Sequence, residues 1–289
     1  MQSEVDSFFQ SFLKKTSLFF RQLVARRRTI EIALKKAVKK PAKIGVLSDI
    51  EGSIEYAQKA AGKLKQEDID CIIIAGDSYE NHEIKYHPRF PYEKDKRRQM
   101  KQGLLPFVKL GVPVYIIPGN HENKNVYRNV LKELRKKHKN LFDITGKTVK
   151  RPSFAIVGLG GFHDFMLSDP DALLIEKRDH KKAEKEIKKL SGKQPIIFVS
   201  HGPPLSTAFI DMVDGFGHTG DVEITRILDE NVQDVINIHG HIHERGGEYE
   251  KFRSGISINI AAITDFRNKR FSNTAVIELV DDKAFYREI

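Results

Sequence analysis

The stretch Ile44-Gly45-Val46-Leu47-Ser48-Asp49-Ile50-Glu51-Gly52 begins as an apolar run and ends with two carboxylates beside a glycine. A short apolar run that ends at turn residues is typical of a buried strand. Further along the chain, similar runs alternate with polar segments of helical character, which predicts a layered α/β fold. The stretch therefore indicates a strand that delivers two acids to the edge of a sheet.

The whole chain follows this alternation. We expect strands at residues 44–48, 71–75, 114–117, 154–158, 196–200, 235–238, 256–259 and 275–279. We expect helices at residues 53–66, 94–110, 126–138, 183–190 and 221–230. Loops at the carboxyl ends of strands in an open α/β sheet converge on one crevice, so the residues that follow these strands should meet.

Ligand-type residues follow five of the expected strands: Asp49 and Glu51, then Asp77, then Asn120, His121 and Glu122, then His201, and last His241 and His243. A single Gly-Asp is usually a turn or a cap, and a single loop histidine is usually hydrogen-bonded without further function. Five separate loops would all have to carry such residues by accident. Their combination therefore predicts one functional site.

Carboxylate, amide and imidazole donors together suit Mn, Fe, Zn or Mg ions. The seven residues other than His121 and Glu122 are too many for one ion, so two ions are expected. In a paired site, one carboxylate bridges both ions, and a bridging water is deprotonated to a hydroxide that attacks phosphorus in line. Such a reaction needs no protein nucleophile.

Over most of residues 43–289, the chain resembles the calcineurin-like metallophosphoesterases. The family series is Asp-x-His, Gly-Asp, Gly-Asn-His-Asp/Glu, a later His and Gly-His-x-His, and four of these five blocks stand here unaltered and in order. The resemblance implies an α/β fold of the four-layer αββα sandwich type. Ser200-His201-Gly202-Pro203-Pro204-Leu205 and Gly240-His241-Ile242-His243-Glu244 are similar to the subgroup that includes the mammalian metallophosphoesterase-domain proteins.

The resemblance also implies roles for the site residues. One ion would be held by Asp49, Glu51, Asp77 and His243, and the other by Asp77, Asn120, His201 and His241, with Asp77 as the bridge. His121 would contact the scissile phosphate and protonate the leaving oxygen instead of binding metal, and Glu122 would orient His121.

Glu51 departs from the family pattern, which usually has histidine at this position. A carboxylate can reach the same ion, so we expect Glu51 to bind it. The added negative charge and harder donor favour Mn, Fe or Mg over Zn, with Mn preferred, and make the bridging water less acidic. The alternative is that Glu51 points away, which would leave one metal site weak.

The N-terminal segment differs from the rest of the chain. Residues 1–43 carry eleven Lys or Arg and three acids, a charge of +8 of the total +10. Apolar residues at near-helical spacing predict an amphipathic helix or helix pair over residues 1–42, which Pro41 ends, followed by the phosphoesterase domain at residues 43–289. This extension could pack on the body or on a second subunit, lie on an anionic membrane surface, or touch nucleic acid.

The remaining composition restricts location and partners. The nearly neutral body argues against a nuclease. The single cysteine, Cys71, allows no intramolecular disulfide and favours a reducing compartment. Neither a long apolar segment nor a signal-peptide pattern is found, so we expect a cytoplasmic protein that is neither exported nor membrane-spanning.

We expect a metal-dependent phosphodiesterase that acts on small nucleotide-like esters. The alternatives are a phosphomonoesterase or protein phosphatase, and an interaction scaffold with a degraded metal site that is recruited through the basic segment. Three segments are candidates to line the substrate pocket: Ser78–Gln102, Gly158–Asp164 with His163, and Asp211–Gly220 with His218.

Overall fold

The structure is a computed structural model that describes residues 29–80, 92–163, 173–230, 233–264, 270–271 and 273–289. Most of the expected N-terminal helical extension, residues 1–28, lies outside the described residues. Within the described part, no helix combines the length and the apolar character that a membrane crossing requires.

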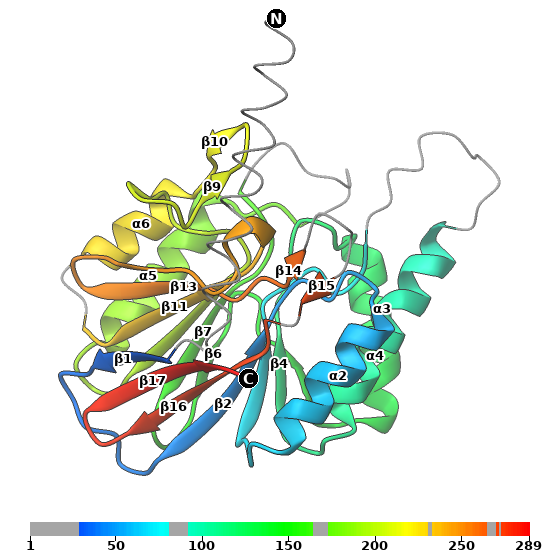
Figure 1. The fold of residues 1–289 in the computed structure, drawn as a ribbon, viewed down its shortest axis with the longest axis horizontal. Coiled ribbons are helices and arrows are strands. Elements are labelled where there is room, and N and C mark those ends of the chain that lie inside the picture. The colour runs from blue at the N-terminus through cyan, green and yellow to red at the C-terminus, as the bar shows by residue number, and fades with distance from the viewer. Residues whose placement is uncertain (1–28, 81–91, 164–172, 231–232, 265–269, 272) are drawn as a thin grey trace, which may run out of the picture.

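Two large sheets form the centre of the molecule (Figure 1). The first sheet has the order β1 (Thr29–Ala33), β17 (Lys283–Glu288), β16 (Ala275–Val280), β2 (Ala42–Leu47), β3 (Cys71–Ile74), β4 (Val114–Ile116) and β5 (Leu141–Asp143). The second has the order β12 (Tyr249–Lys251), β13 (Gly255–Asn259), β11 (Val235–His239), β8 (Ile196–Ser200), β7 (Ala155–Leu159) and β6 (Thr148–Lys150). Strands β2 to β5 are parallel, as are β7, β8, β11 and β13.

Helices cover the outer face of each sheet. The first sheet is covered by α2 (Ile54–Lys65), α3 (Tyr92–Val108) and α4 (Lys124–Lys137), and the second by α5 (Lys177–Leu190) and α6 (Val222–Asp229) (Figure 1). Two small ladders, β9 (Met212–Val213) with β10 (Gly217–His218) and β14 (Ile263–Thr264) with β15 (Arg270–Phe271), and the 3-10 helix η1 (His243–Arg245) complete the described elements. The expected αββα sandwich is confirmed.

The alternation of side chains along each strand explains the layers. In β8, Val199 packs in the core between the two sheets, whereas Phe198 packs under α5 and α6. In β3, Ile73 faces the same central core and Ile72 faces the helices of the first sheet. Successive side chains of a strand point to opposite faces, so a sheet buried on both faces needs uninterrupted apolar strands.

Residues 29–33 correct the prediction of a helix over residues 1–42. They form β1, which pairs antiparallel with β17 at the edge of the first sheet. Ile30 is buried in the central core while Thr29 and Glu31 are exposed, so this short stretch has the period of a strand. Glu31 also forms an ion pair of 2.7 Å with Lys283 of β17. Pairing with the open edge of β17 therefore determines the structure of these residues, despite the weak helical spacing of the surrounding sequence.

Helices α5 and α6 are joined by a buried His–Asp pair. Nε2 of His180 lies 2.6 Å from Oδ2 of Asp221, the residue that caps the N-terminus of α6. Burial lowers the pKa of His180, but the hydrogen bond and charge of Asp221 outweigh burial and raise this pKa above its usual 6.5. Protonated His180 therefore stabilises the fold, fully below about pH 6.5 and progressively less as pH rises through the raised pKa.

Substituting His180→Gln should lower the free energy of unfolding by about 1–3 kcal/mol near pH 6, because a hydrogen bond between charged groups is lost. The difference from the parent should shrink at higher pH, where His180 is neutral in both states. Denaturant unfolding at about pH 6 and about pH 9, with His138→Gln as the matched control, measures this difference. An effect of equal size at both pH values would contradict the ion pair.

Candidate metal centre

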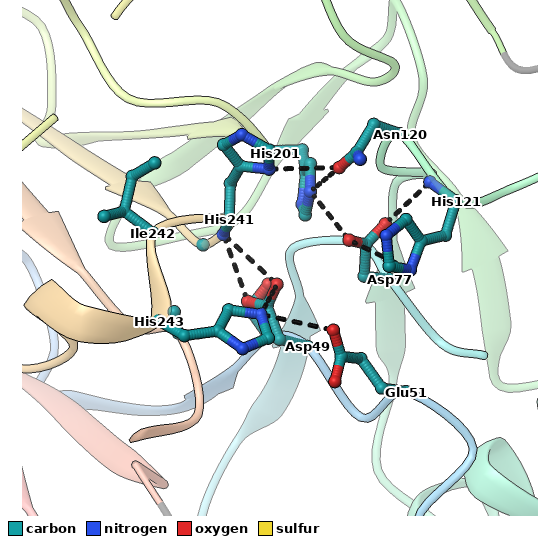
Figure 2. Close-up of polar contacts among 12 residues, drawn as sticks. Asp49, Glu51, Asp77, Asn120, His121, His201, His241, Ile242 and His243 are labelled. Atoms are coloured by element: carbon teal, nitrogen blue, oxygen red, sulfur yellow. Dashed lines mark hydrogen bonds and ion pairs between the residues drawn. The ribbon is translucent and has the colours of Figure 1, made fainter. Parts of the chain in front are cut away.

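The loops that follow β2, β3, β4, β8 and β11 meet at one end of the sheets. Figure 2 shows the side chains that they carry pointing toward a common centre: Asp49, Glu51, Asp77, Asn120, His121, His201, His241 and His243. The structure thus brings together all seven residues expected to bind metal, with His121 beside them. Two of the loops lead directly into helices, because Ser53 caps α2 and Asn123 caps α4.

Four of these residues have left-handed backbone conformations. The φ angles are 56° for Asp49, 43° for Glu51, 50° for Asp77 and 71° for His241. Residues other than glycine rarely adopt positive φ, and such strained positions gather at functional sites. Here the sharp turns at the strand ends aim the carboxylates and the imidazole into one crevice. Gly119 fits against Asp77 and His201 only because it has no Cβ atom.

Asp77 is the central residue of the cluster. Its Oδ2 atom lies 3.1 Å from Nε2 of His201 and 3.7 Å from Nδ1 of His121, and its Oδ1 atom accepts the backbone N–H of His121 at 3.0 Å. Burial raises the pKa of Asp77, but the charges of His121 and His201 outweigh burial and hold this pKa far below its usual value. Asp77 is therefore a deprotonated donor at the middle of the site.

The His201 ring is fixed by a backbone contact. Nδ1 lies 2.8 Å from the carbonyl oxygen of Ala75, so Nδ1–H donates to this oxygen and Nε2 faces the site. Such a contact selects the tautomer and ring orientation that metal binding needs. Burial lowers the pKa of His201, yet Asp77, with Asp49 adding to its effect, raises it to about 10. The carboxylates thus create a potential that favours positive charge at this point.

Asn120 and His241 complete one donor group. Oδ1 of Asn120 lies 2.8 Å from Nε2 of His201 and 3.1 Å from Nδ1 of His241. Burial, followed by the charge of His201, lowers the pKa of His241 to about 3, so its ring is neutral and able to bind metal. Donor atoms of Asp77, His201 and His241 all lie within 4.8 Å of one another.

Asp49, Glu51 and His243 form a second set of contacts, in which Asp49 also accepts the backbone N–H of His241 at 3.2 Å (Figure 2). Nε2 of His243 is 3.2 Å from Oδ1 of Asp49 and 3.3 Å from Oε1 of Glu51. Burial raises the pKa of Asp49, but the hydrogen bond and charge of His243 outweigh burial and lower it. Glu51 therefore points into the site, unlike the alternative in which it points away. A second group with donor atoms within 4.8 Å consists of Glu51, Asp77 and His121.

His121 stands at the edge of the cluster. Its Nδ1 atom is buried and has no hydrogen-bond partner among the described residues, and 19% of its side chain is exposed. A buried polar atom without a partner in the protein is costly unless a ligand or an ion satisfies it. His121 is thus available to a bound phosphate ester or, as the second donor group allows, to an ion.

Glu122 is placed differently from the prediction that it orients His121. Its buried carboxylate accepts backbone N–H groups from Asp77 at 3.1 Å, Ser78 at 2.5 Å and Gly119 at 2.7 Å, and so joins two of the ligand loops. Burial and the charge of Asp77 raise the pKa of Glu122 to about 7. Since all three partners are donors, the contacts fit the ionised carboxylate, which only accepts.

Phe162 is a site residue that the sequence reasoning missed. Its ring centroid lies 4.3 Å from that of His241 and 6.2 Å from that of His201, so it supports both imidazoles. The Gly-Gly-Phe-His stretch after β7 was predicted to line the pocket, but His163 was the residue selected from it. His163 contacts the Phe162 ring at 4.9 Å and lies 3.7 Å from Asp221.

Two further segments were expected to line the pocket. Residues 81–91 of Ser78–Gln102 lie outside the described residues. In Asp211–Gly220, Nδ1 of His218 lies 2.7 Å from Oδ1 of the buried Asp211. Because the second carboxylate oxygen accepts the backbone N–H of Gly220, Asp211 stabilises this loop.

A model of the calcineurin-like phosphoesterase family matches residues 42–245. The chain belongs to this family. Members of the calcineurin-like phosphoesterase family generally bind two divalent metal ions, and the two donor groups described above fit that chemistry. Among curated proteins, none matches the sequence of this phosphoesterase.

Solved structures of two other proteins have a similar fold. A dimetal phosphatase from Danio rerio has a TM-score of 0.60 and 14% identity, with 86% of this chain and 97% of that chain covered. The protein TT1561 of Thermus thermophilus has a TM-score of 0.57 and 15% identity, with 81% and 98% covered. At these identities, the likeness shows the fold alone.

Proposed function

We propose that this phosphoesterase hydrolyses phosphate esters at a pair of divalent metal ions. One ion would be held by Asp49, Glu51, Asp77 and His243, and the other by Asp77, Asn120, His201 and His241. The observation that carries the proposal is the meeting of these donors around Asp77, with distances of 2.8–3.3 Å between neighbouring side chains.

The protein's own residues have distinct tasks in this reaction. Two bound divalent ions would supply an activated water for attack on phosphorus and would neutralise the charge of the phosphate. Asp77, which belongs to both donor groups, stays ionised. The carbonyl of Ala75 holds the His201 ring in one tautomer. His121, whose Nδ1 atom has no hydrogen-bond partner among the described residues, binds the phosphate and donates a proton to the leaving oxygen.

We further propose that the substrates are small phosphodiesters that resemble nucleotides. Hydrolysis of a chromogenic phosphodiester and of its monoester by the Mn-loaded protein tests this directly. Preference for the diester supports the proposal, whereas preference for the monoester would make the enzyme a phosphomonoesterase. Full metal loading without turnover of either ester would indicate an interaction scaffold.

Manganese is the proposed metal because the site contains three carboxylates, those of Asp49, Glu51 and Asp77. Substituting Glu51→His should improve activity with Zn relative to Mn and lower the pH optimum, since removing a negative charge makes the activated water more acidic. Rates with each metal, measured across pH for parent and variant, give both quantities. An unchanged metal ranking and pH profile would refute this role of Glu51.

We propose a cytoplasmic location and a homo-oligomer held together by the basic N-terminal segment. Cys71 is buried, and burial raises the pKa of its thiol to about 12, which makes it unreactive.

Removing residues 1–28 leaves β1 in the sheet, so the mass of this variant in solution tests whether the N-terminal segment holds subunits together. An unchanged oligomeric state would remove that role.

A further inference from the structure

Exposed apolar side chains gather in the segment that follows β8 and His201. Leu205, Phe209, Phe216 and Val222 are 39%, 58%, 79% and 62% exposed. The segment contains the β9–β10 hairpin, which projects beyond α6 (Figure 1). Exposed apolar residues that cluster in one segment mark an interaction site more often than scattered ones do.

This segment is attached at two points to the loops that carry His201 and His243. It leaves the His201 loop and returns beside it, where the backbone N–H of Asp221 donates to the carbonyl of Pro203 at 2.9 Å. It is also held by Arg245, only two residues after His243. The Arg245 side chain donates to the carbonyl of Met212 at 3.2 Å and to Asp214 at 2.8 Å.

Phe209 and Arg245 lie within cation–π distance of each other at this junction. The Arg245 guanidinium lies 5.9 Å from the centroid of the Phe209 ring, within the range of a cation–π contact. The contacts with Met212 and Asp214 fix the guanidinium, while more than half of Phe209 remains exposed. An exposed aromatic ring beside a planar cation that is held by hydrogen bonds is a surface on which a second planar group stacks favourably.

The charge of the segment restricts what can bind. Residues 205–223 contain four acids and neither Lys nor Arg. The acids are paired, Asp211 with His218, Asp214 with Arg245, Asp221 with His180 and Glu223 with Arg226. The segment therefore lacks the excess of basic residues that attracts anionic membrane surfaces and nucleic-acid backbones. A small group that is planar and aromatic remains the best fit, because its contacts with Phe209 and Arg245 need no further basic residues.

We propose that Phe209 and Arg245 form a platform that binds the planar aromatic group, such as a nucleobase, of the phosphate ester at the metal centre. The proposal rests on the proposed function, because the phosphate of the same molecule would lie at the metals near His243. Phe209 is then a residue that determines specificity, and Arg245 is a positioning residue that also offers its planar face.

Binding of AMP and of inorganic phosphate to the Mn-loaded full chain, measured by calorimetry, tests the platform. The parent should bind AMP roughly ten-fold more tightly than phosphate, in line with the stacking energy of one base. Phe209→Ala should remove this preference and leave phosphate affinity unchanged, whereas Phe209→Trp should keep it. Phe142→Ala, which changes another exposed phenylalanine in β5, is the matched control.

Equal affinity of the parent for AMP and phosphate would overturn the platform, and so would a preference for AMP that survives Phe209→Ala. Loss of the preference in Phe142→Ala as well would also overturn it. Phosphate released from AMP is measured after each titration, so that binding is assigned separately from hydrolysis. A protein that prefers AMP through Phe209 but hydrolyses no ester would overturn the proposed function and leave the platform intact.

Discussion

Replacing Asp77 by Asn should lower kcat/KM by on the order of a thousand-fold and release at least one of the two ions. Asn has nearly the same shape but lacks the negative charge that would neutralise both ions. Asp77 belongs to both donor groups and lies 3.1 Å from His201. Kinetics with a saturating amount of Mn, together with the metal content of the purified variant, measure both effects.

A matched control separates charge at the site from backbone strain. Asp68 also has a positive φ, 51°, but it is exposed and lies in the turn after α2. Asp68→Asn should therefore leave activity and metal content unchanged. If Asp77→Asn retained two ions and activity within about ten-fold of the parent, Asp77 would not bridge the metals.

Replacing His121 by Gln should lower kcat by about a hundred-fold to ten-thousand-fold while both ions remain bound. The reason is the loss of a proton donor and phosphate contact, since the His121 side chain borders Asp77 at 3.7 Å. Diesters with more acidic leaving groups should lose less activity, because they need less help from a proton donor. A series of esters with different leaving groups measures this dependence.

The metal content of the His121 variant decides between two roles. If the variant retains both ions, His121 acts as the proton donor. If it loses an ion, His121 is a metal ligand, which its position beside Glu51 and Asp77 permits. His138→Gln, at the C-terminal end of α4, is the control for a histidine outside the site. An equal loss of activity for all leaving groups would contradict proton donation.

The sequence predicts the central strands well because burial on both faces makes them uniformly apolar. Strand β8 has the expected bounds, and the other expected strands differ by one or two residues at one or both ends. Strands β1 and β17, which lie side by side at one end of the first sheet, were not predicted. In both strands, more buried residues alternate with more exposed ones, and only the partner strand determines that Thr29–Ala33 pairs with Lys283–Glu288.

The same contrast applies to the site. Its donors were predictable because each follows a strand within a short motif. The contacts of Glu122 were not predictable, because its carboxylate binds backbone N–H groups of Asp77 and Ser78, which carry no side-chain signal. The support that Phe162 gives to His241 arises only when β7 and the loop after β11 are brought together by folding.

Anomalous diffraction from crystals of the full chain grown with Mn tests the central claim most directly. The account predicts two peaks, about 3.5–4 Å apart, with Asp77 between them. His201, His241 and Asn120 should surround one peak, and Asp49, Glu51 and His243 the other. A single peak, or none at saturating Mn, would contradict a two-metal centre.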